Sequence, residues 1–241
     1  LSKEQIDPAC IKGVDAVIHL AGEGITDQRW TRKRKKKLLE SRTKSIKLIY
    51  SLLEKESTHQ VKTVISACAT GYYGNRGNEI LTEESPPSDT FLARLCVAWE
   101  NAAQEGSKLH IRTVNMRTGF VLSNQGGALT PMVKLTKLGL GSTLGDGEQW
   151  ISWIHIEDVI QMYIFALEHP SIHGIYNMVA PHPTTNKVMT TVLAQLLKRP
   201  LWLPAIPEWV LNLLMGKMSV LVLDSARVSS DKILSTGFKF K

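Results

Sequence analysis

Four short apolar runs recur along the chain, each followed by a polar or glycine-rich stretch. They occupy residues 15–20, 61–67, 111–117 and 175–178. Runs of this length with apolar residues at nearly every position are typical of strands that are covered on both faces in a parallel sheet. We therefore expect these four segments to be the strands of one parallel sheet.

Longer segments with helical periodicity alternate with these runs, over residues 29–53, 88–104 and 157–168. The first begins R-W-T-R-K-R-K-K-K, and its apolar stripe predicts that most of the lysines lie on the opposite, solvated face. The second is expected to be capped by Ser88 or Asp89. This alternation predicts an α/β fold, a doubly wound parallel sheet of Rossmann type with helices on both faces.

The pattern becomes irregular in two later parts of the chain, where Gly and Pro separate short helices expected at residues 184–198 and 208–215. We interpret these parts as a smaller C-terminal substrate lobe that is interleaved with the sheet domain along the sequence. The division places residues 1–120 and 154–180 in the sheet domain, and residues 121–153 and 181–241 in the lobe.

Small residues gather where the first three expected strands end. The strand ends read H-L-A-G-E at residues 19–23, A-C-A-T-G-Y-Y-G at 67–74 and M-R-T-G-F at 116–120. Glycine and alanine let a ligand approach the backbone closely, and ligands of doubly wound sheets bind beyond the carboxyl ends of the strands. We therefore expect a ligand cleft where these three ends meet.

Composition and charge narrow the class of protein. The 241 residues carry 29 Lys+Arg against 22 Asp+Glu, a net charge of +7. The three cysteines have no C-x-x-C spacing, so we expect neither a disulfide framework nor a metal site, and a reducing cytoplasm fits best. No apolar run approaches the roughly 18 residues of a membrane span. In the basic segment only Trp30 could serve as an exposed aromatic, so we expect no nucleic-acid partner.

The strand ends and several other motifs resemble those of the extended short-chain dehydrogenase/reductase superfamily, which contains NAD(P)-dependent nucleotide-sugar epimerases and dehydratases. More narrowly, the chain is similar to an atypical epimerase-like subfamily, whose bacterial members are often labelled sugar-nucleotide epimerases or cell-division-inhibitor-like proteins. The similarity runs from about Gly13 to Phe240. The motifs that carry it, besides the first two strand ends, are R-W at 29–30, S-R at 41–42, L-C-x-x-W-E at 95–100 and W-I-H-I-x-D at 153–158.

The resemblance implies a nicotinamide dinucleotide, NADP or NAD, at the strand ends of a dinucleotide-binding domain. It implies that Leu20, Ala21 and Gly22 pack their backbone against this cofactor, although a tight turn would explain Gly22 equally well. Arg42 takes the position of a cofactor-contacting asparagine, and its guanidinium would bond ribose or phosphate oxygens unless it is a surface arginine. Lys37 would extend the same contact or point to water.

The chain departs from the family pattern at its start. The resemblance implies a strand and a Gly-rich turn that hold the dinucleotide pyrophosphate, and this element should precede Leu1. The glycines at 139, 141, 145 and 147 do not replace it, because no strand precedes them and no long helix follows them. We therefore expect the first strands of the sheet and the main phosphate cradle to be missing from these residues.

A second departure concerns the acid/base residues. Leu92 and Cys96 stand where the family has its tyrosine and lysine, so Leu92 would face the cofactor without reacting. Thr70 is the nearest match to the serine or threonine that polarises the substrate. Tyr73 is either the replacement acid/base or a packed aromatic. Arg117, which closes the third expected strand, either binds a ligand anion or pairs with a buried carboxylate.

Taken together, the resemblance implies reversible hydride transfer at a carbinol carbon of a small molecule, with nucleotide sugars as the substrate class. Because the family's tyrosine and lysine are replaced, a second class of function, one without catalysis, stays open. In that alternative the protein binds NAD(P)(H) without catalysis and regulates a partner or senses redox state. A third alternative is an interaction protein that uses its basic helix.

Overall fold

A computed structural model describes residues 6–56 and 58–241. Its centre is a parallel sheet, as predicted, whose strands lie in the order β1-β2-β4-β8. These strands are β1 (Ala16–His19), β2 (Thr63–Ala69), β4 (Arg112–Thr118) and β8 (Gly174–Met178). Each coincides with one of the four apolar runs to within two residues at either end.

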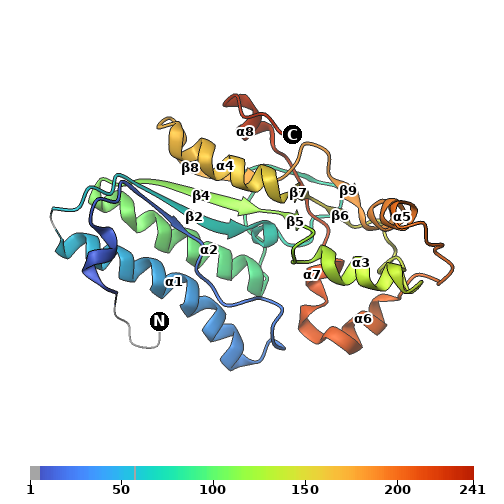
Figure 1. Cartoon of the computed structure of the whole chain (residues 1–241). Coiled ribbons are helices and arrows are strands. Elements are labelled where there is room, and N and C mark those ends of the chain that lie inside the picture. Colours follow the sequence, from blue (N-terminus) through green and yellow to red (C-terminus); the bar gives the residue numbers. More distant parts are fainter. Residues whose placement is uncertain (1–5, 57) are drawn as a thin grey trace.

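Helices cover both faces of this sheet, which confirms the doubly wound fold (Figure 1). α1 (Arg32–Lys55) and α2 (Phe91–Gln104) lie on one face, and α4 (Ile156–Glu168) lies on the other. The predicted cap of α2 is wrong, because the Thr90 hydroxyl accepts the hydrogen bond from the Ala93 amide. Asp89 lies one position before this cap residue, and its side chain pairs with Arg94 instead.

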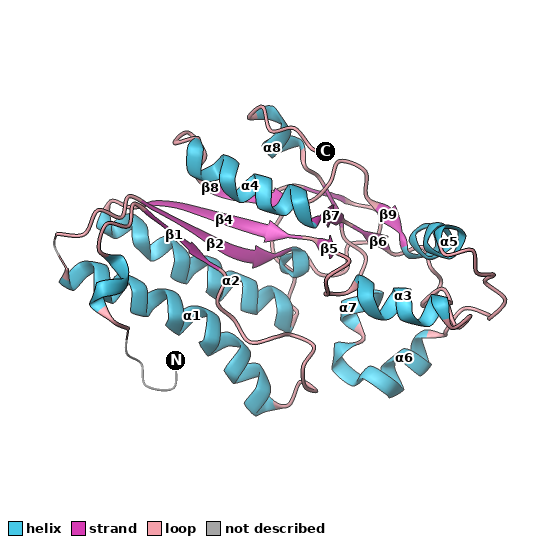
Figure 2. Ribbon diagram, viewed as in Figure 1, coloured by secondary structure: helices cyan, strands magenta, loops and turns pink. Residues whose placement is uncertain are grey.

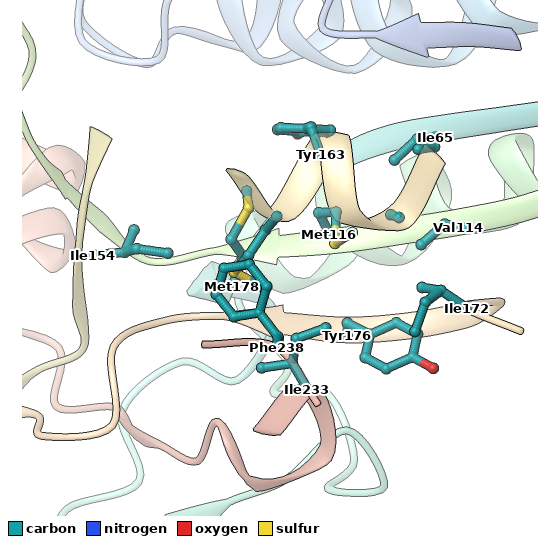
Figure 3. Packing of buried hydrophobic residues seen from close by; sticks show 12 residues of the cluster. Ile65, Val114, Met116, Ile154, Tyr163, Ile172, Tyr176, Met178, Ile233 and Phe238 are labelled. Carbon is teal, nitrogen blue, oxygen red and sulfur yellow. The ribbon is translucent and has the colours of Figure 1, made fainter. Parts of the chain in front are cut away.

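The two faces of the sheet are packed with separate apolar clusters. Between the sheet and α4, a cluster that includes Met116, Met162 and Met178 is fully buried, and Figure 3 shows several of its side chains. On the other face, Ile46 and Leu53 of α1 are buried in a second cluster. Each fully buried aliphatic side chain contributes about 1.5 to 3 kcal/mol, so these clusters fix both helix layers on the sheet.

The remaining helices and strands are short. The helices α3 (Leu129–Lys137), α5 (Asn186–Leu196), α6 (Glu208–Met215) and α7 (Val220–Leu223) gather beyond the carboxyl ends of the strands (Figure 2). The segment after residue 226 returns to the sheet unit, where Ile233 and Phe238 join the core under α4. The other short elements are η1 (Pro8–Ile11), η2 (Thr70–Tyr72), β3 (Ile80–Leu81), η3 (Glu105–Leu109), β5 (Phe120–Leu122), β6 (Trp150–Ile151), β7 (Trp153–His155), β9 (Thr184–Thr185), η4 (Gly216–Met218), β10 (Arg227–Val228) and α8 (Asp231–Ser235).

The basic helix α1 only partly matches the expected distribution of charge. Its lysines 33, 36 and 37 are exposed, as predicted, but Arg34 and Arg42 are buried. Among residues 6–56 and 58–241, no helix is long and apolar enough to cross a membrane. The same residues contain no group of three or more His, Cys, Asp or Glu side chains placed to hold a metal ion.

Candidate functional site

The carboxyl end of β1 leads into an exposed turn of small residues. Leu20 is 62% exposed, and Ala21 and Gly22 that follow it are also exposed. A Cβ atom on Gly22 would lie only 3.0 Å from the guanidinium carbon of Arg42. The turn therefore runs directly over the Arg42 side chain, and a larger residue at position 22 would displace one of them.

Arg42 is buried beneath this turn, so its interpretation as a surface arginine is wrong. Its terminal nitrogens donate to the carbonyl oxygens of Leu38 and Glu23, each at 3.0 Å, and its guanidinium lies 5.0 Å from the Trp99 ring centroid. Burial lowers its pKa below the ordinary arginine value. The Nε atom is buried and has no hydrogen-bond partner among the described residues. A buried guanidinium with an unused donor suits an oxygen-rich ligand.

His19, the last residue of β1, connects the strand to α1. Its Nε2 atom lies 2.7 Å from the Ser45 hydroxyl, and its Nδ1 atom lies 3.4 Å from the Ser66 hydroxyl. Burial and the nearby Arg42 charge lower the His19 pKa to about 4. The imidazole is therefore neutral at pH 7, and its contact with Ser45 ties α1 to the end of β1.

Lys37 is exposed and forms an ion pair with Glu23, with 2.8 Å between Nζ and Oε1. The other carboxylate oxygen of Glu23 accepts a hydrogen bond from Arg34, also at 2.8 Å. The hydrogen bonds from Lys37 and then from Arg34 lower the Glu23 pKa. Lys37 thus lies beside the turn that follows β1, within reach of a ligand placed over Gly22.

Thr70 and Tyr73 flank the end of β2 but differ in their surroundings. The Thr70 side chain is half-buried, and its hydroxyl makes no hydrogen bond with the described residues. Tyr73 is fully buried, donates to Asn177 Oδ1 at 2.6 Å and accepts from Arg117 at 2.9 Å. Burial raises its pKa to about 12. Tyr73 therefore has the geometry of a packed aromatic with a satisfied hydroxyl, which favours the second of its two predicted roles.

Arg117 forms an ion pair with a buried carboxylate, as in the second of the two roles predicted from the sequence. Its Nε and one terminal nitrogen donate to Glu100 at 2.7 and 2.9 Å, and Arg117 is 1% exposed. Desolvation alone would lower its pKa, but the bonds to Glu100 raise it above the ordinary value. Protein groups bond this buried guanidinium through all three of its nitrogens, which favours the structural role over cofactor binding.

Leu92 and Cys96 lie on the face of α2 that looks towards the end of β2. A Cβ atom on Gly71 would lie 3.4 Å from the Leu92 Cβ atom. Cys96 is buried next to Cys68, and burial raises the Cys68 pKa well above its ordinary value. Leu92 carries no proton to exchange, and the Cys96 thiol donates to the Ala69 carbonyl oxygen at 3.5 Å.

Sequence reasoning missed Trp99 and Glu100 as parts of this site, although both stand in the L-C-x-x-W-E motif. Trp99 packs against Arg42, and Glu100 fixes Arg117. Because they are consecutive residues of α2, their side chains point in different directions. Trp99 faces α1 and Glu100 faces β4. The signal that could have identified them is a bulky aromatic and a carboxylate at the end of an apolar helix face, opposite two arginines on other elements.

Comparisons with known proteins agree with this geometry. The family model described as "NAD dependent epimerase/dehydratase family" matches residues 2–180, and one described as "Domain of unknown function (DUF1731)" matches residues 206–241. The chain is 36% identical over 233 residues to the "Epimerase family protein SDR39U1 homolog, chloroplastic" of Arabidopsis thaliana. That alignment covers 96% of this chain but only 66% of the plant protein, just under two thirds of its length.

Two solved structures extend the similarity to three dimensions. The human epimerase family protein SDR39U1 (isoform 2) with NADPH superposes with a TM-score of 0.86 at 30% identity, covering 94% of this chain and 77% of that one. The nucleoside-diphosphate sugar epimerase from Corynebacterium glutamicum superposes with a TM-score of 0.79 at 33% identity, covering 98% of this chain and 45% of that one.

Proposed function

This chain belongs to the NAD-dependent epimerase/dehydratase family, and we propose that it is an NAD(P)-dependent oxidoreductase. Its reaction is reversible hydride transfer at a carbinol carbon of a small substrate of the nucleotide-sugar class. NADPH in the human structure supports the cofactor, with NAD as the other form. The name of the Corynebacterium glutamicum structure supports the substrate class. The three cysteines are all free, which is in keeping with a reducing cytoplasm.

The observation that carries this proposal is the buried Arg42 side chain under Gly22. The unpartnered Nε donor lies at the carboxyl edge of the parallel sheet, where ligands of this fold bind. Leu20, Ala21 and Gly22 are exposed, so a ligand can reach the turn that they form. In this proposal, Arg42 and Lys37 would bond the ribose or phosphate oxygens of a dinucleotide, and Leu92 would contact it from α2.

A nicotinamide cofactor supplies or accepts the hydride when it is bound. The chain itself would contribute the Thr70 hydroxyl, which has no partner among the described residues and is free to donate to a substrate oxygen. The apolar surroundings of Leu92 would exclude water from the reacting carbon. Proton exchange then requires a group other than Tyr73, Leu92 or Cys96.

The test is a fluorescence titration of NADPH and NADH into the 241-residue chain. We expect saturable binding, and we expect Arg42→Gln to weaken it roughly ten-fold or more, because a hydrogen bond from a charged donor is lost. Lys47→Gln is the matched control, since it removes one charge from the same helix near Glu105 and should leave binding within two-fold. Absence of saturable binding for both dinucleotides overturns the proposal.

A second function, binding of NAD(P)(H) without catalysis, is favoured by one observation. The positions of the family's proton-transferring tyrosine and lysine hold Leu92 and the buried Cys96. Such a protein would report redox state or regulate a partner. Stereospecific transfer of deuterium from labelled NADPH to an added carbonyl substrate supports the enzyme, whereas saturable binding without any transfer across a panel of sugar nucleotides and ketones supports the regulator.

A further inference from the structure

Large apolar side chains are exposed at one end of the small lobe. α3 continues beyond Lys137 into a turn where Leu138, 73% exposed, and Leu140 face solvent. α5 ends at Leu196, which is 75% exposed, and the loop after it carries the exposed Trp202. In Figure 1 this loop projects at the right-hand edge of the molecule, beside the end of α3. We call the four side chains of Leu138, Leu140, Leu196 and Trp202 the lobe tip.

Contacts between the two segments hold the lobe tip together. A Cβ atom on Gly139 would lie 3.8 Å from the indole Nε1 atom of Trp202. The Ser142 hydroxyl donates to the Pro204 carbonyl oxygen at 2.6 Å. α3 and α5 also pack against each other. The turn after α3 and the loop after α5 therefore form one continuous surface, although they are about 60 residues apart in sequence.

The charges around the lobe tip are all positive. Residues 129–145 and 187–207 contain no Asp or Glu. Each of four exposed cations lies within four residues of a lobe-tip side chain: Lys134, Lys137, Lys198 and Arg199. Within the described ranges 6–56 and 58–241, none of these four forms an ion pair, whereas Lys187 at the opposite end of α5 lies 4.0 Å from Glu148. The lobe tip thus combines apolar surface with a rim of unpaired cations.

The turn that ends α5 places one of these cations in an unfavourable backbone conformation. Lys198 has a φ of 52°, in the left-handed region that favours glycine. Its amide donates to the Gln195 carbonyl oxygen at 3.0 Å, and the Arg199 amide donates to that of Ala194 at 2.9 Å. Glycine would make this turn with less strain. The sequence therefore places a cation on the rim in spite of a conformational cost.

We propose that the lobe tip is a docking surface for the anionic face of a lipid bilayer. At such a face, leucine side chains enter the boundary of the acyl chains, a tryptophan ring lies at the level of the headgroups, and cations contact anionic lipids. Binding of this kind involves one leaflet and needs no helix that spans the membrane. Protein–protein interfaces are depleted in lysine, whereas three of the four rim cations are lysines. The inference is independent of the proposed function, because it needs neither cofactor nor substrate.

The test is flotation of the 241-residue chain with vesicles that contain phosphatidylglycerol, compared with vesicles of phosphatidylcholine alone. We expect binding to the anionic vesicles that weakens as salt rises, and little binding to the neutral ones. Trp202→Ser removes the interfacial ring and Lys137→Glu turns an attraction into a repulsion, so each should weaken binding roughly ten-fold. Ile80→Ser and Lys108→Glu are the matched controls, because both residues are exposed and lie outside the lobe. Each should change binding by less than about two-fold.

Three outcomes would overturn this assignment. They are no binding of the unmodified chain to anionic vesicles, equal binding to neutral vesicles, and equal losses in Trp202→Ser and Ile80→Ser. Circular dichroism of each variant shows whether a loss reflects unfolding instead.

Two further measurements separate the bilayer from a second copy of the chain and from the cofactor. Sedimentation equilibrium without lipid detects self-association, and a dimer that Trp202→Ser abolishes would assign the lobe tip to a second copy and overturn the lipid assignment. NADPH titration tests the proposed function separately. Vesicle binding by a chain that binds no dinucleotide retains the docking surface while rejecting the proposed function.

Discussion

At the scale of single residues, the neutral His19 makes folding stability depend on pH. Its pKa is about 4 in the folded protein against 6.5 for an ordinary histidine, so the unfolded chain binds more protons between these values. Stability that is fully present above pH 6.5 is therefore lost as the pH falls toward 4, by on the order of 2 to 3 kcal/mol. Urea unfolding at several pH values should show this slope, and His19→Gln should flatten it. An unchanged slope in His19→Gln contradicts the assignment.

Tyr73 provides a second prediction at this scale. Tyr73→Phe removes the hydroxyl that Arg117 and Asn177 share, which leaves two buried polar groups with one partner fewer. We expect the free energy of unfolding to fall by about 1 to 3 kcal/mol and NADPH affinity to stay unchanged. If turnover of an identified substrate disappears while stability is retained, Tyr73 is the acid/base after all.

At the scale of elements, the Thr90 cap fixes the start of α2, the helix that carries Leu92. Thr90→Ala removes the side-chain acceptor for the Ala93 amide and should lower the free energy of unfolding by about 1 kcal/mol. Asp89→Ala is the control, because the Asp89 side chain is 98% exposed and its ion pair with Arg94 contributes at most a few tenths of a kcal/mol. Thermal unfolding of both variants measures the difference. A larger loss in Asp89→Ala would restore the cap predicted from the sequence.

The long elements could be predicted because their periodicity extends over many residues. The helix over 208–215 has the predicted bounds, and the four strands of the sheet follow the four apolar runs. The shortest strands have only two residues each, which is too few to show an alternation of apolar and polar positions. They are β3, β6, β9 and β10. The burial of Arg42 could not be predicted either. It depends on Trp99, which arrives from a different helix, whereas the local sequence shows only one more cation in a basic segment.

At the scale of the whole molecule, β1 is an edge strand with apolar side chains facing outward. Among residues 6–56 and 58–241 it pairs with β2 alone, and Ile18 and Leu20 are 41% and 62% exposed. Exposed apolar edges of this kind are a template for a further strand. In this fold, a strand and Gly-rich turn placed there would bring backbone amides to a dinucleotide pyrophosphate that lies over Gly22.

The free edge leads to a prediction about cofactor affinity. In hydrogen exchange, the amides of Ala16–His19 should exchange faster than those of β2, which is paired on both sides. Joining a strand, Gly-rich turn and helix of the dinucleotide-binding type to the amino end should slow exchange in β1. It should also tighten NADPH binding by ten-fold or more, since the added amides and helix dipole hold the phosphates. Slower exchange without tighter binding would mean that the strand docks but the cofactor does not lie across Gly22. Arg42→Gln in the extended chain should weaken NADPH binding by the same factor as in the shorter one, because the two contacts act on different parts of the cofactor.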